Sequence, residues 1–253
     1  MDSFQRLHAS SVPTTEGVAA MIRAGLTGGL ASGKSTVSAI FRALGAHVLE
    51  ADAIGRQLME PGQHVYDAIV AAFGPEIVQA DGSLNRRRLA EIAFGQNRIL
   101  ELNRIVHPAV VEMQRLWVEE LAAREAEAVA IVESALIFEA DQQGTVPGWR
   151  QRFDHLILVT APVEMRIERY VERMRPGSKV TIAELEADAR ARLAAQIPDG
   201  EKIPLVDDVI YNDGSLDATR EQAGRIYAKL AEEARRNLPL QRGSDGSDIF
   251  RRG

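Results

Sequence analysis

Apolar positions along the chain fall into two patterns, short apolar runs and longer segments with helical spacing. Continuous apolar runs are typical of strands that are buried on both faces of a parallel sheet. The chain predicts strands at residues 22–26, 47–50, 128–132, 155–159 and 208–211. Because these strands alternate with helical segments, the pattern predicts an α/β fold with a mostly parallel β-sheet flanked by helices.

The helical segments show apolar stripes that end at glycines. Between residues 37 and 44 the apolar residues recur at the i, i+3, i+4, i+7 spacing of one helix face, and Gly45 marks the helix end. A similar stripe over residues 65–73 is closed by Gly74. Further helices are expected at 53–58, at 86–128 with an interruption before Pro108, at 162–174, at 182–196 and from about 216 onward.

The composition fits one compact domain and excludes several classes of protein. The chain has 253 residues, a formal net charge of −6 and no cysteine, so disulfide frameworks, thiolate metal sites and cysteine nucleophiles are excluded. The acidic balance argues against a non-specific nucleic-acid binder, and no apolar run approaches the ~18 residues that span a bilayer. Residues 1–20 lack an apolar signal segment, so we expect a cytoplasmic protein. We expect a domain over 21–237, a disordered extension over 1–20 and a disordered tail over 238–253.

A glycine-rich segment directly after the first predicted strand carries the strongest chemical signal. Residues 28–35 match the phosphate-loop pattern G-x-x-x-x-G-K-[S/T], and an amphipathic helix follows them. Backbone N–H groups in such a loop turn toward a phosphate, and the helix N-terminus adds its positive end. Lys34 can reach the β- and γ-phosphates of ATP, and the Ser35 hydroxyl can hold Mg²⁺. The competing interpretation is a glycine-rich turn with a solvated lysine.

The remaining sequence narrows down what is done with the phosphate. A GTPase would need an N-K-x-D motif to bind guanine, and none occurs. A small-molecule kinase needs a carboxylate near the acceptor hydroxyl, cations over the transferring phosphoryl group and an acidic group near the metal. Asp52 and Glu50 end the second strand, where α/β sheets place ligands. Arginines gather over 166–192, and Glu133 follows the third strand.

Each of these candidates also has a structural interpretation. Asp52 would equally serve as the N-cap of the helix over 53–58, and the arginines would equally form a solvated helix face. His107, beside Pro108, is more often structural. Aromatic and apolar residues that could line an acceptor pocket belong more often to a core; they are Trp117, Trp149 and Phe138, the last followed by Glu139.

Taken together, the segments resemble the dephospho-coenzyme A kinase family over about residues 22–230. The resemblance is carried by residues 25–36, 51–56, 73–74, 81–86, 94, 107–108, 136–139, 202 and 207–212, by Arg169 with Arg173, and by Arg192 with Gln196. The phosphate loop is shared by many families. The segments Asp-Gly-x-Leu-x-Arg, His-Pro and Leu-x-Phe-Glu, in this order, are far more specific.

The resemblance implies a P-loop kinase that uses ATP and Mg²⁺ to phosphorylate the ribose 3′-hydroxyl of dephospho-CoA, the last step of coenzyme A synthesis. It also implies a helical CoA-binding subdomain at about 60–128 and a mobile lid at about 166–195. Asp52, Lys34 and Arg169 would be the catalytic residues. The nucleotide would be bound by Gly28, Gly29, Ala31, Ser32, Gly33, Lys34, Ser35, Thr36, Arg173 and Asn212, and the acceptor by Thr27, Asp52, Arg56, Arg86 and His107.

The chain departs from the family pattern at two carboxylates. The family usually has Asp-Ala-Asp at 50–52, where this chain has Glu50, and Asp-x-Pro-Leu-Leu at 133–137, where it has Glu133. Each glutamate is one methylene longer than the aspartate it replaces. Carboxylate chemistry survives both changes, but they alter the metal and water geometry around Glu50 and Glu133, while Asp52 is unchanged. The expected metal contact is Ser35, and Glu133 is a candidate to act on the metal through a water.

Two other functions stay open at this point. The chain could be a different small-molecule kinase, acting on nucleoside monophosphates or on shikimate-type alcohols. It could also be a nucleotide-binding regulator that binds ATP without acceptor-stimulated turnover. The expected partners are ATP and dephospho-CoA, with no nucleic acid and no membrane, and the sequence leaves the oligomeric state open.

Overall fold

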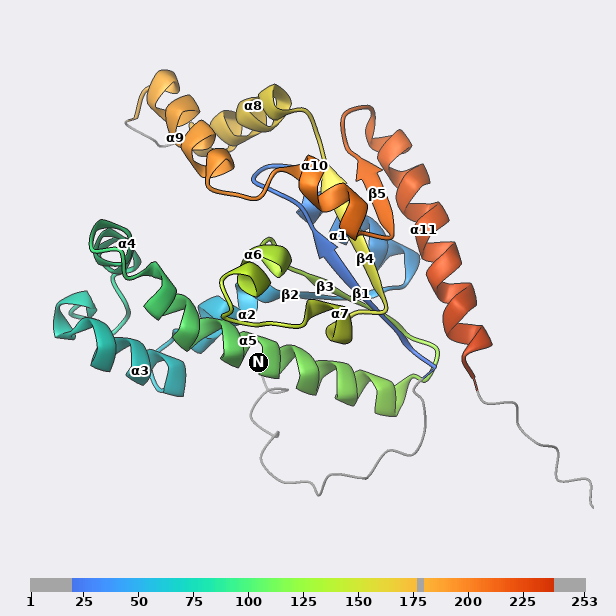
Figure 1. Cartoon of the computed structure of the whole chain (residues 1–253), viewed down its shortest axis with the longest axis horizontal. Helices are drawn as coiled ribbons and strands as arrows, with labels where there is room; N and C mark the ends of the chain where they lie inside the picture. Colours follow the sequence, from blue (N-terminus) through green and yellow to red (C-terminus); the bar gives the residue numbers. More distant parts are fainter. Residues whose placement is uncertain (1–19, 177–179, 239–253) are drawn as a thin grey trace, which may run out of the picture.

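The computed structural model describes residues 20–176 and 180–238, and a five-stranded parallel sheet lies at its centre (Figure 1). The strand order is β2-β3-β1-β4-β5. Since all pairs are parallel, the carboxyl ends of the strands meet at one edge of the sheet. The strands are β1 (Ile22–Thr27), β2 (His47–Glu50), β3 (Val129–Glu133), β4 (His155–Thr160) and β5 (Asp208–Tyr211). The predicted α/β fold is confirmed, with every strand boundary within one residue.

The two faces of the sheet are covered by different helices. α1 (Lys34–Leu44) and α11 (Leu216–Arg236) pack on one face, where Phe41 and Leu230 join Ile131 in the largest core cluster. On the other face, Val132 packs with Phe138 of α6 (Ile137–Gln142) and Phe153, which follows α7 (Trp149–Arg152). Neighbouring residues of β3 point to opposite faces because side chains alternate along a strand.

A helical layer extends from the β2 side of the sheet. It consists of α2 (Ala51–Leu58), α3 (His64–Phe73), the 3₁₀ turn η1 (Pro75–Ile77), α4 (Arg86–Gly95) and α5 (Ile99–Arg124). α3 and α4 lie at the left of Figure 1, and α5 runs from there across to the β3 side, where Leu121 packs with Ala130. The apolar residues of the layer form a core cluster of their own, centred on Ile69 and Ile77. The assignment of residues 60–128 as an acceptor-binding subdomain remains a prediction.

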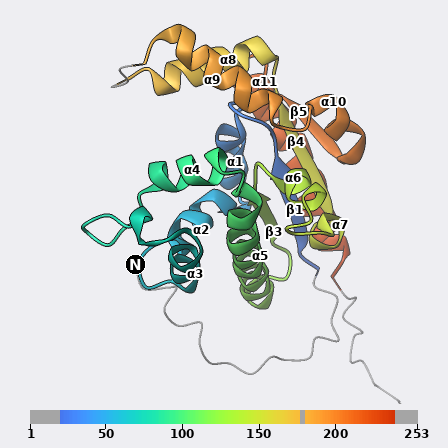
Figure 2. The same ribbon diagram turned by 60° about the vertical axis from the view of Figure 1, so that its left-hand side comes forward.

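Two helices project beyond the carboxyl edge of the sheet. α8 (Val163–Met174) and α9 (Ile182–Ala194) lie side by side in both views (Figures 1 and 2). Leu30 and Ala31 of the glycine-rich loop pack against their apolar faces. The chain then returns through α10 (Asp199–Lys202) and η2 (Ile203–Leu205) to β5.

Some sequence predictions about helices are wrong. The interruption expected before Pro108 does not exist, because α5 continues through this residue. A proline inside a helix loses one backbone hydrogen bond, yet the helix stays continuous here, with Val106 and Val110 facing Gly55 of α2. The break falls instead at residues 96–98, where Asn97 adopts a positive φ of 56°.

Other predictions lie at the limits of the described chain. Residues 1–19 and 239–253, expected to be disordered, are outside the described residues, while Ala20 is buried. Among residues 20–176 and 180–238, no helix is long and apolar enough to cross a membrane. The short helices α6, α7 and α10 were not predicted, since segments of four to six residues show too little periodicity.

Candidate active site

The glycine-rich loop joins β1 to α1 at the carboxyl edge of the sheet. Gly33 precedes the first helical residue with a φ of 99°, and a Cβ at this position would lie 1.9 Å from Nδ2 of Asn212. Any larger residue would therefore displace the loop from its neighbour. The loop ends at the N-terminus of α1, where the free N–H groups of the first turn favour an anion.

Lys34 folds back over this loop. Its Nζ donates to the backbone oxygens of Gly28 at 2.7 Å and Gly29 at 3.2 Å. Burial lowers the pKa of Lys34, while the nearby carboxylates of Glu133 and Asp52 oppose this shift. A desolvated ammonium group beside free helix N–H groups is well suited to a phosphate.

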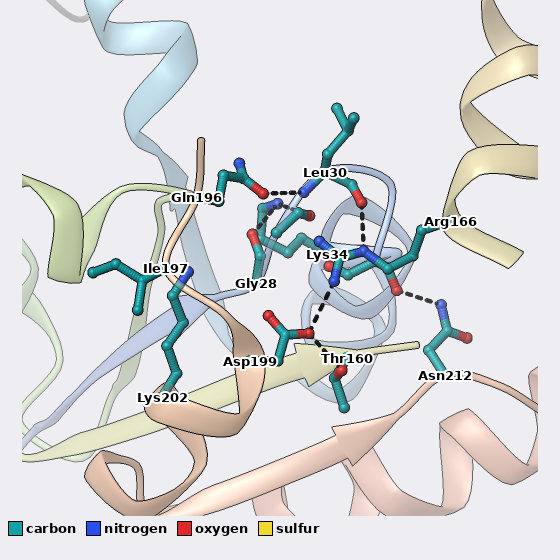
Figure 3. A network of polar contacts seen from close by, with 12 residues as sticks. Gly28, Leu30, Lys34, Thr160, Arg166, Gln196, Ile197, Asp199, Lys202 and Asn212 are labelled. Atoms are coloured by element: carbon teal, nitrogen blue, oxygen red, sulfur yellow. Dashed lines mark hydrogen bonds and ion pairs between the residues drawn. The ribbon is translucent and has the colours of Figure 1, made fainter. Parts of the chain in front are cut away.

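Side chains from the α8–α10 region hold the apex of the loop (Figure 3). Arg166, which is buried, donates from Nε to the backbone oxygen of Leu30 at 2.8 Å and from Nη1 to Oδ2 of Asp199 at 3.0 Å. The Leu30 N–H donates to Oε1 of Gln196 at 2.9 Å. Thr160 also donates to Asp199, at 2.6 Å. Sequence analysis counted Arg166 among the cations but gave no role to Gln196 or Asp199.

Asn212, at the end of β5, holds the other side of the loop. Its Nδ2 donates to the backbone oxygen of Ser32 at 2.9 Å, and its Oδ1 accepts from Thr219 at 3.0 Å. Arg169 donates from Nη2 to the backbone oxygen of Asn212 at 2.9 Å, and its Nη1 is buried without a partner. Arg173 is exposed, 5.7 Å from the ring of Tyr170, and the structure does not bring it to the loop.

Asp52 lies in the first turn of α2, at the same edge of the sheet. The alternative that Asp52 caps this helix is wrong, because α2 begins at Ala51 and Glu50 occupies the cap position without a side-chain cap bond. Asp52 instead lines a small cavity of about 140 Å³ together with Glu50, Ser35 and Glu133. The structure thus brings together the predicted carboxylates and the predicted metal-binding hydroxyl.

The two glutamates of this cavity are held by different partners. Glu50 accepts from Nη2 of Arg42 at 2.6 Å, an exposed ion pair. Glu133 accepts at Oε2 from the buried hydroxyl of Ser38 at 2.7 Å. Ser38 lies one turn after Ser35 on α1, so it fixes the longer carboxylate beside the start of the helix.

A second, larger cavity of about 310 Å³ opens on the other side of Asp52. Its walls are mostly apolar and come from α2, α5, α6 and the segment before β4. Arg56 and His107 line it as predicted. Arg86 lies outside it, paired with Glu60 at 3.2 Å beside a separate hollow. Thr27 is fully buried at the end of β1, and its hydroxyl has no partner within the described part of the chain.

His107 has a defined orientation in this cavity. Its Nδ1 lies 2.9 Å from Oγ1 of Thr145, whose own hydroxyl donates to the backbone oxygen of Ala140 at 3.1 Å. Because the threonine hydroxyl proton points to the Ala140 oxygen, the imidazole must be the donor in its contact with Thr145. Nδ1 therefore carries the proton, and Nε2 is left as an acceptor. Burial lowers the pKa of His107, which favours this neutral form.

The aromatic candidates belong to the core. Phe138 and Trp149 meet edge to face with ring centres 5.2 Å apart, and Trp117 packs against the same cluster. Glu139 is buried in an ion pair of 2.7 Å with Lys202, which is 0 % exposed. Two further polar residues, Gln114 and Arg152, line the larger cavity. Sequence analysis did not name them, because single polar residues in helical segments give no sequence signal of their own.

The fold and these two cavities define a class of protein. A parallel sheet with a phosphate loop after its first strand, and a carboxylate facing that loop from the end of the next strand, is the arrangement of a P-loop kinase. Comparison with known proteins identifies the family within this class.

The dephospho-CoA kinase family model matches residues 22–218. The dephospho-CoA kinase of Moorella thermoacetica is 38% identical over 207 residues, which are 81% of this chain and 91% of that protein. The enzyme of Bacillus cereus is 38% identical over 81% of this chain and 95% of its own length. The chain belongs to the dephospho-CoA kinase family, and it is an ATP-dependent kinase rather than a nucleotide-binding regulator.

Solved structures share the fold of this chain. The crystal structure of TT1252 from Thermus thermophilus has a TM-score of 0.63 and 36% identity, and covers 83% of this chain and 97% of that chain. A dephospho-CoA kinase from Campylobacter jejuni has a TM-score of 0.53 at 22% identity, covers 85% of this chain and 100% of that chain, and shows that the fold is shared.

Proposed function

We propose that the chain transfers the γ-phosphoryl group of ATP to the 3′-hydroxyl of dephospho-CoA in the space around Asp52. One observation carries this proposal: Asp52 lines both the small polar cavity beside Ser35 and the larger cavity that His107 lines. A carboxylate shared by both cavities lies where an acceptor hydroxyl would meet the end of a bound triphosphate. In-line transfer needs this positioning more than it needs covalent chemistry.

The phosphates of ATP are proposed to bind to the loop and the first turn of α1. Lys34 would exchange its contacts with the Gly28 and Gly29 oxygens for contacts with the β- and γ-phosphates. The backbone of the loop would surround the β-phosphate; the residues involved are Gly28, Gly29, Ala31, Ser32, Gly33, Ser35 and Thr36. Asn212 supports this proposal indirectly, since it fixes the Ser32 carbonyl.

Asp52 is proposed to orient the ribose hydroxyl and to take its proton as the phosphoryl group arrives. It is exposed toward the cavities, so its carboxylate is accessible to the acceptor. Arg56 lies one helical turn further along α2 and lines both cavities, where it can bind an anionic part of the acceptor. His107, with Nε2 as an acceptor, is suited to a hydroxyl donor of the substrate.

The polar cavity fits a magnesium ion that arrives with the nucleotide. Its side-chain oxygens, from Ser35, Asp52 and Glu133, are the hard donors that Mg²⁺ prefers. Among the described residues, no group of three or more acidic or histidine side chains could hold a metal alone. Ser35 would therefore contact the ion directly and Glu133 through a water. Bound there, Mg²⁺ would neutralise charge on the β- and γ-phosphates.

The α8–α9 pair is proposed to act as the lid of the site. Arg166 already contacts the loop, and Arg169 has a buried Nη1 without a partner, which makes it available to a phosphate or to the adenine of ATP. Arg173 would reach the nucleotide only if the pair moved toward the loop. Such closure would exclude water as a competing phosphoryl acceptor.

The test is acceptor-dependent consumption of ATP by the full chain. ATP turnover should be stimulated strongly by dephospho-CoA, and much less by nucleoside monophosphates or by shikimate-type alcohols. The product should carry the phosphate on the 3′-oxygen, as determined by ³¹P NMR. Equal stimulation by the other alcohols would contradict the proposed acceptor. The cytoplasmic location and the absence of nucleic-acid partners stay predictions.

A further inference from the structure

The acceptor cavity contains a buried amide that the protein does not use. Gln114, in the middle of α5, is 6 % exposed and lines the cavity. Across the described ranges 20–176 and 180–238, no hydrogen-bond partner is found for its side chain. Among the described residues, the amide does not count among the fully buried atoms without a partner, so its polar atoms are accessible from the cavity although most of the residue is buried. An unpaired amide that faces a cavity is therefore available to a ligand.

A second polar group in the same cavity also lacks a polar partner. Arg152, just before β4, has a buried Nε without a hydrogen bond, and its guanidinium lies 5.3 Å from the ring centre of Phe153. Burial lowers the pKa of Arg152, and a more distant charge on Asp141 only partly opposes this. Within the described part of the chain, no carboxylate forms an ion pair with it. Two unpaired polar groups in the lining indicate that this cavity is built for a ligand.

The wall between Asp52 and Gln114 restricts which part of the acceptor can lie there. Along α5, His107, Val110 and Gln114 recur at helical spacing, so they share one face, and Ile137 of α6 also contributes to the cavity. The residues between His107 and Gln114 on this face are apolar, and no cation is found among the cavity-lining residues of α5. The arginines of the cavity, Arg56 and Arg152, come from α2 and from the segment before β4. The purine base is attached directly to the reacting ribose, with no charged group between them.

We propose that Gln114 recognises the adenine base of the acceptor. The inference rests on the proposed function, since it takes dephospho-CoA as the acceptor and Asp52 as the group that holds its ribose. The amide oxygen accepts from the 6-amino group and the amide nitrogen donates to the neighbouring ring nitrogen, the bidentate pairing that glutamine forms with adenine. Arg152 lies beside the ring as an unpaired guanidinium, as arginines do at unstacked bases.

The experiment compares two acceptors, dephospho-CoA and its analogue with unsubstituted purine in place of adenine. The wild type should prefer adenine by about 10- to 100-fold in kcat/KM, because the analogue leaves the amide oxygen unpaired. In Gln114→Met this preference should fall to near one. The KM for dephospho-CoA should rise about tenfold, with the KM for ATP unchanged. The melting temperature should stay the same or rise, since the variant loses no hydrogen bond within the protein.

Gln222→Met is the matched control. The Gln222 amide accepts from the Tyr211 N–H at 2.9 Å and donates to the Tyr211 oxygen at 3.0 Å. This variant should lower the melting temperature and leave the preference for adenine unchanged.

Three results would overturn the inference. If Gln114→Met keeps the preference for adenine, the amide does not contact the base. If it weakens both acceptors equally but does not weaken adenosine 5′-diphosphate as an acceptor, the amide contacts the pantetheine arm. If it melts earlier and keeps its preference, its role is structural. If the wild type does not phosphorylate dephospho-CoA at all, the proposed function fails instead.

Discussion

The phosphate loop and the acceptor cavity lie on either side of Asp52 and are built in different ways. The loop is one continuous segment, and its contacts within the protein involve mostly backbone atoms: the Lys34 ammonium meets backbone oxygens, and Arg166 and Gln196 meet the Leu30 backbone. The cavity is assembled from side chains of four segments, and it keeps an amide and a guanidinium without polar partners.

This difference distinguishes nucleotide recognition, which is general, from acceptor recognition, which is specific. A backbone cradle recognises any triphosphate, because its donors do not depend on side chains. The cavity recognises its ligand through single side chains, so each contact can be removed alone. Substitutions in the loop should therefore affect nucleotide binding and turnover together, whereas substitutions in the cavity should affect the acceptor alone.

The strongest test of this comparison is Asp52→Asn, because Asp52 lines both the small polar cavity beside Ser35 and the larger acceptor cavity. If Asp52 is the general base, kcat should fall by about 10²- to 10⁴-fold, while the Kd for ATP measured by calorimetry changes little. Glu50→Gln is the control, since Glu50 lines the same polar cavity but is paired with Arg42. An Asp52→Asn variant that keeps nearly full kcat would show that Asp52 is not the general base.

Lys34→Ala tests the loop alone. It removes the cation that we propose to contact the transferring phosphoryl group, so kcat/KM for ATP should fall by about 10²- to 10³-fold. Binding of dephospho-CoA without nucleotide should be unchanged, since Lys34 does not line the acceptor cavity. Lys229→Ala, which removes an exposed lysine paired with Asp208 at 3.1 Å, is the matched control. Unchanged ATP binding and turnover in Lys34→Ala would refute the loop assignment.

The same contrast explains how much the sequence could predict. The strands and the loop are local features: a continuous apolar run or a glycine pattern is visible in a few residues, and both were predicted correctly. Glu133 was placed correctly at its strand end, whereas Asp52 lies two residues beyond β2, in the first turn of α2. Both still line the polar cavity, because parallel strands bring their carboxyl ends to one edge.

The acceptor cavity could not be predicted in this way. Gln114 and Arg152 are 38 positions apart and line the same cavity only because α5 packs near the segment before β4. The contacts of Gln196 and Asp199 with the loop likewise depend on the path of the chain between α9 and α10. Periodicity indicates which face of a helix is buried, but it does not indicate which polar residue on that face stays unpaired.

The buried ion pair of Lys202 with Glu139 connects the two regions. Glu139 belongs to α6, which lines the acceptor cavity, and Lys202 belongs to α10, which begins with Asp199. Lys202→Met leaves a buried carboxylate unpaired and should lower the free energy of unfolding in urea by about 3–5 kcal/mol. The double variant Lys202→Met with Glu139→Leu should recover most of this loss. If the double variant were as unstable as the single one, the pair would not be the cause.

The smallest expected effect is a pH dependence that arises in the cavity. Burial lowers the pKa of His107 below its ordinary value of 6.5, so the unfolded chain binds this proton at a higher pH than the folded chain does. In the window just below pH 6.5 the unfolded state therefore holds more protons, and stability falls as the pH falls. His107→Gln should remove this part of the slope of stability against pH when unfolding in urea is compared at several pH values.

Thr145→Val is the control. It keeps the imidazole and should retain the slope, although it removes the contact of 2.9 Å with Nδ1. If His107→Gln left the slope unchanged, the pH dependence would arise from other groups, and the neutral imidazole assigned to the acceptor cavity would lose its support.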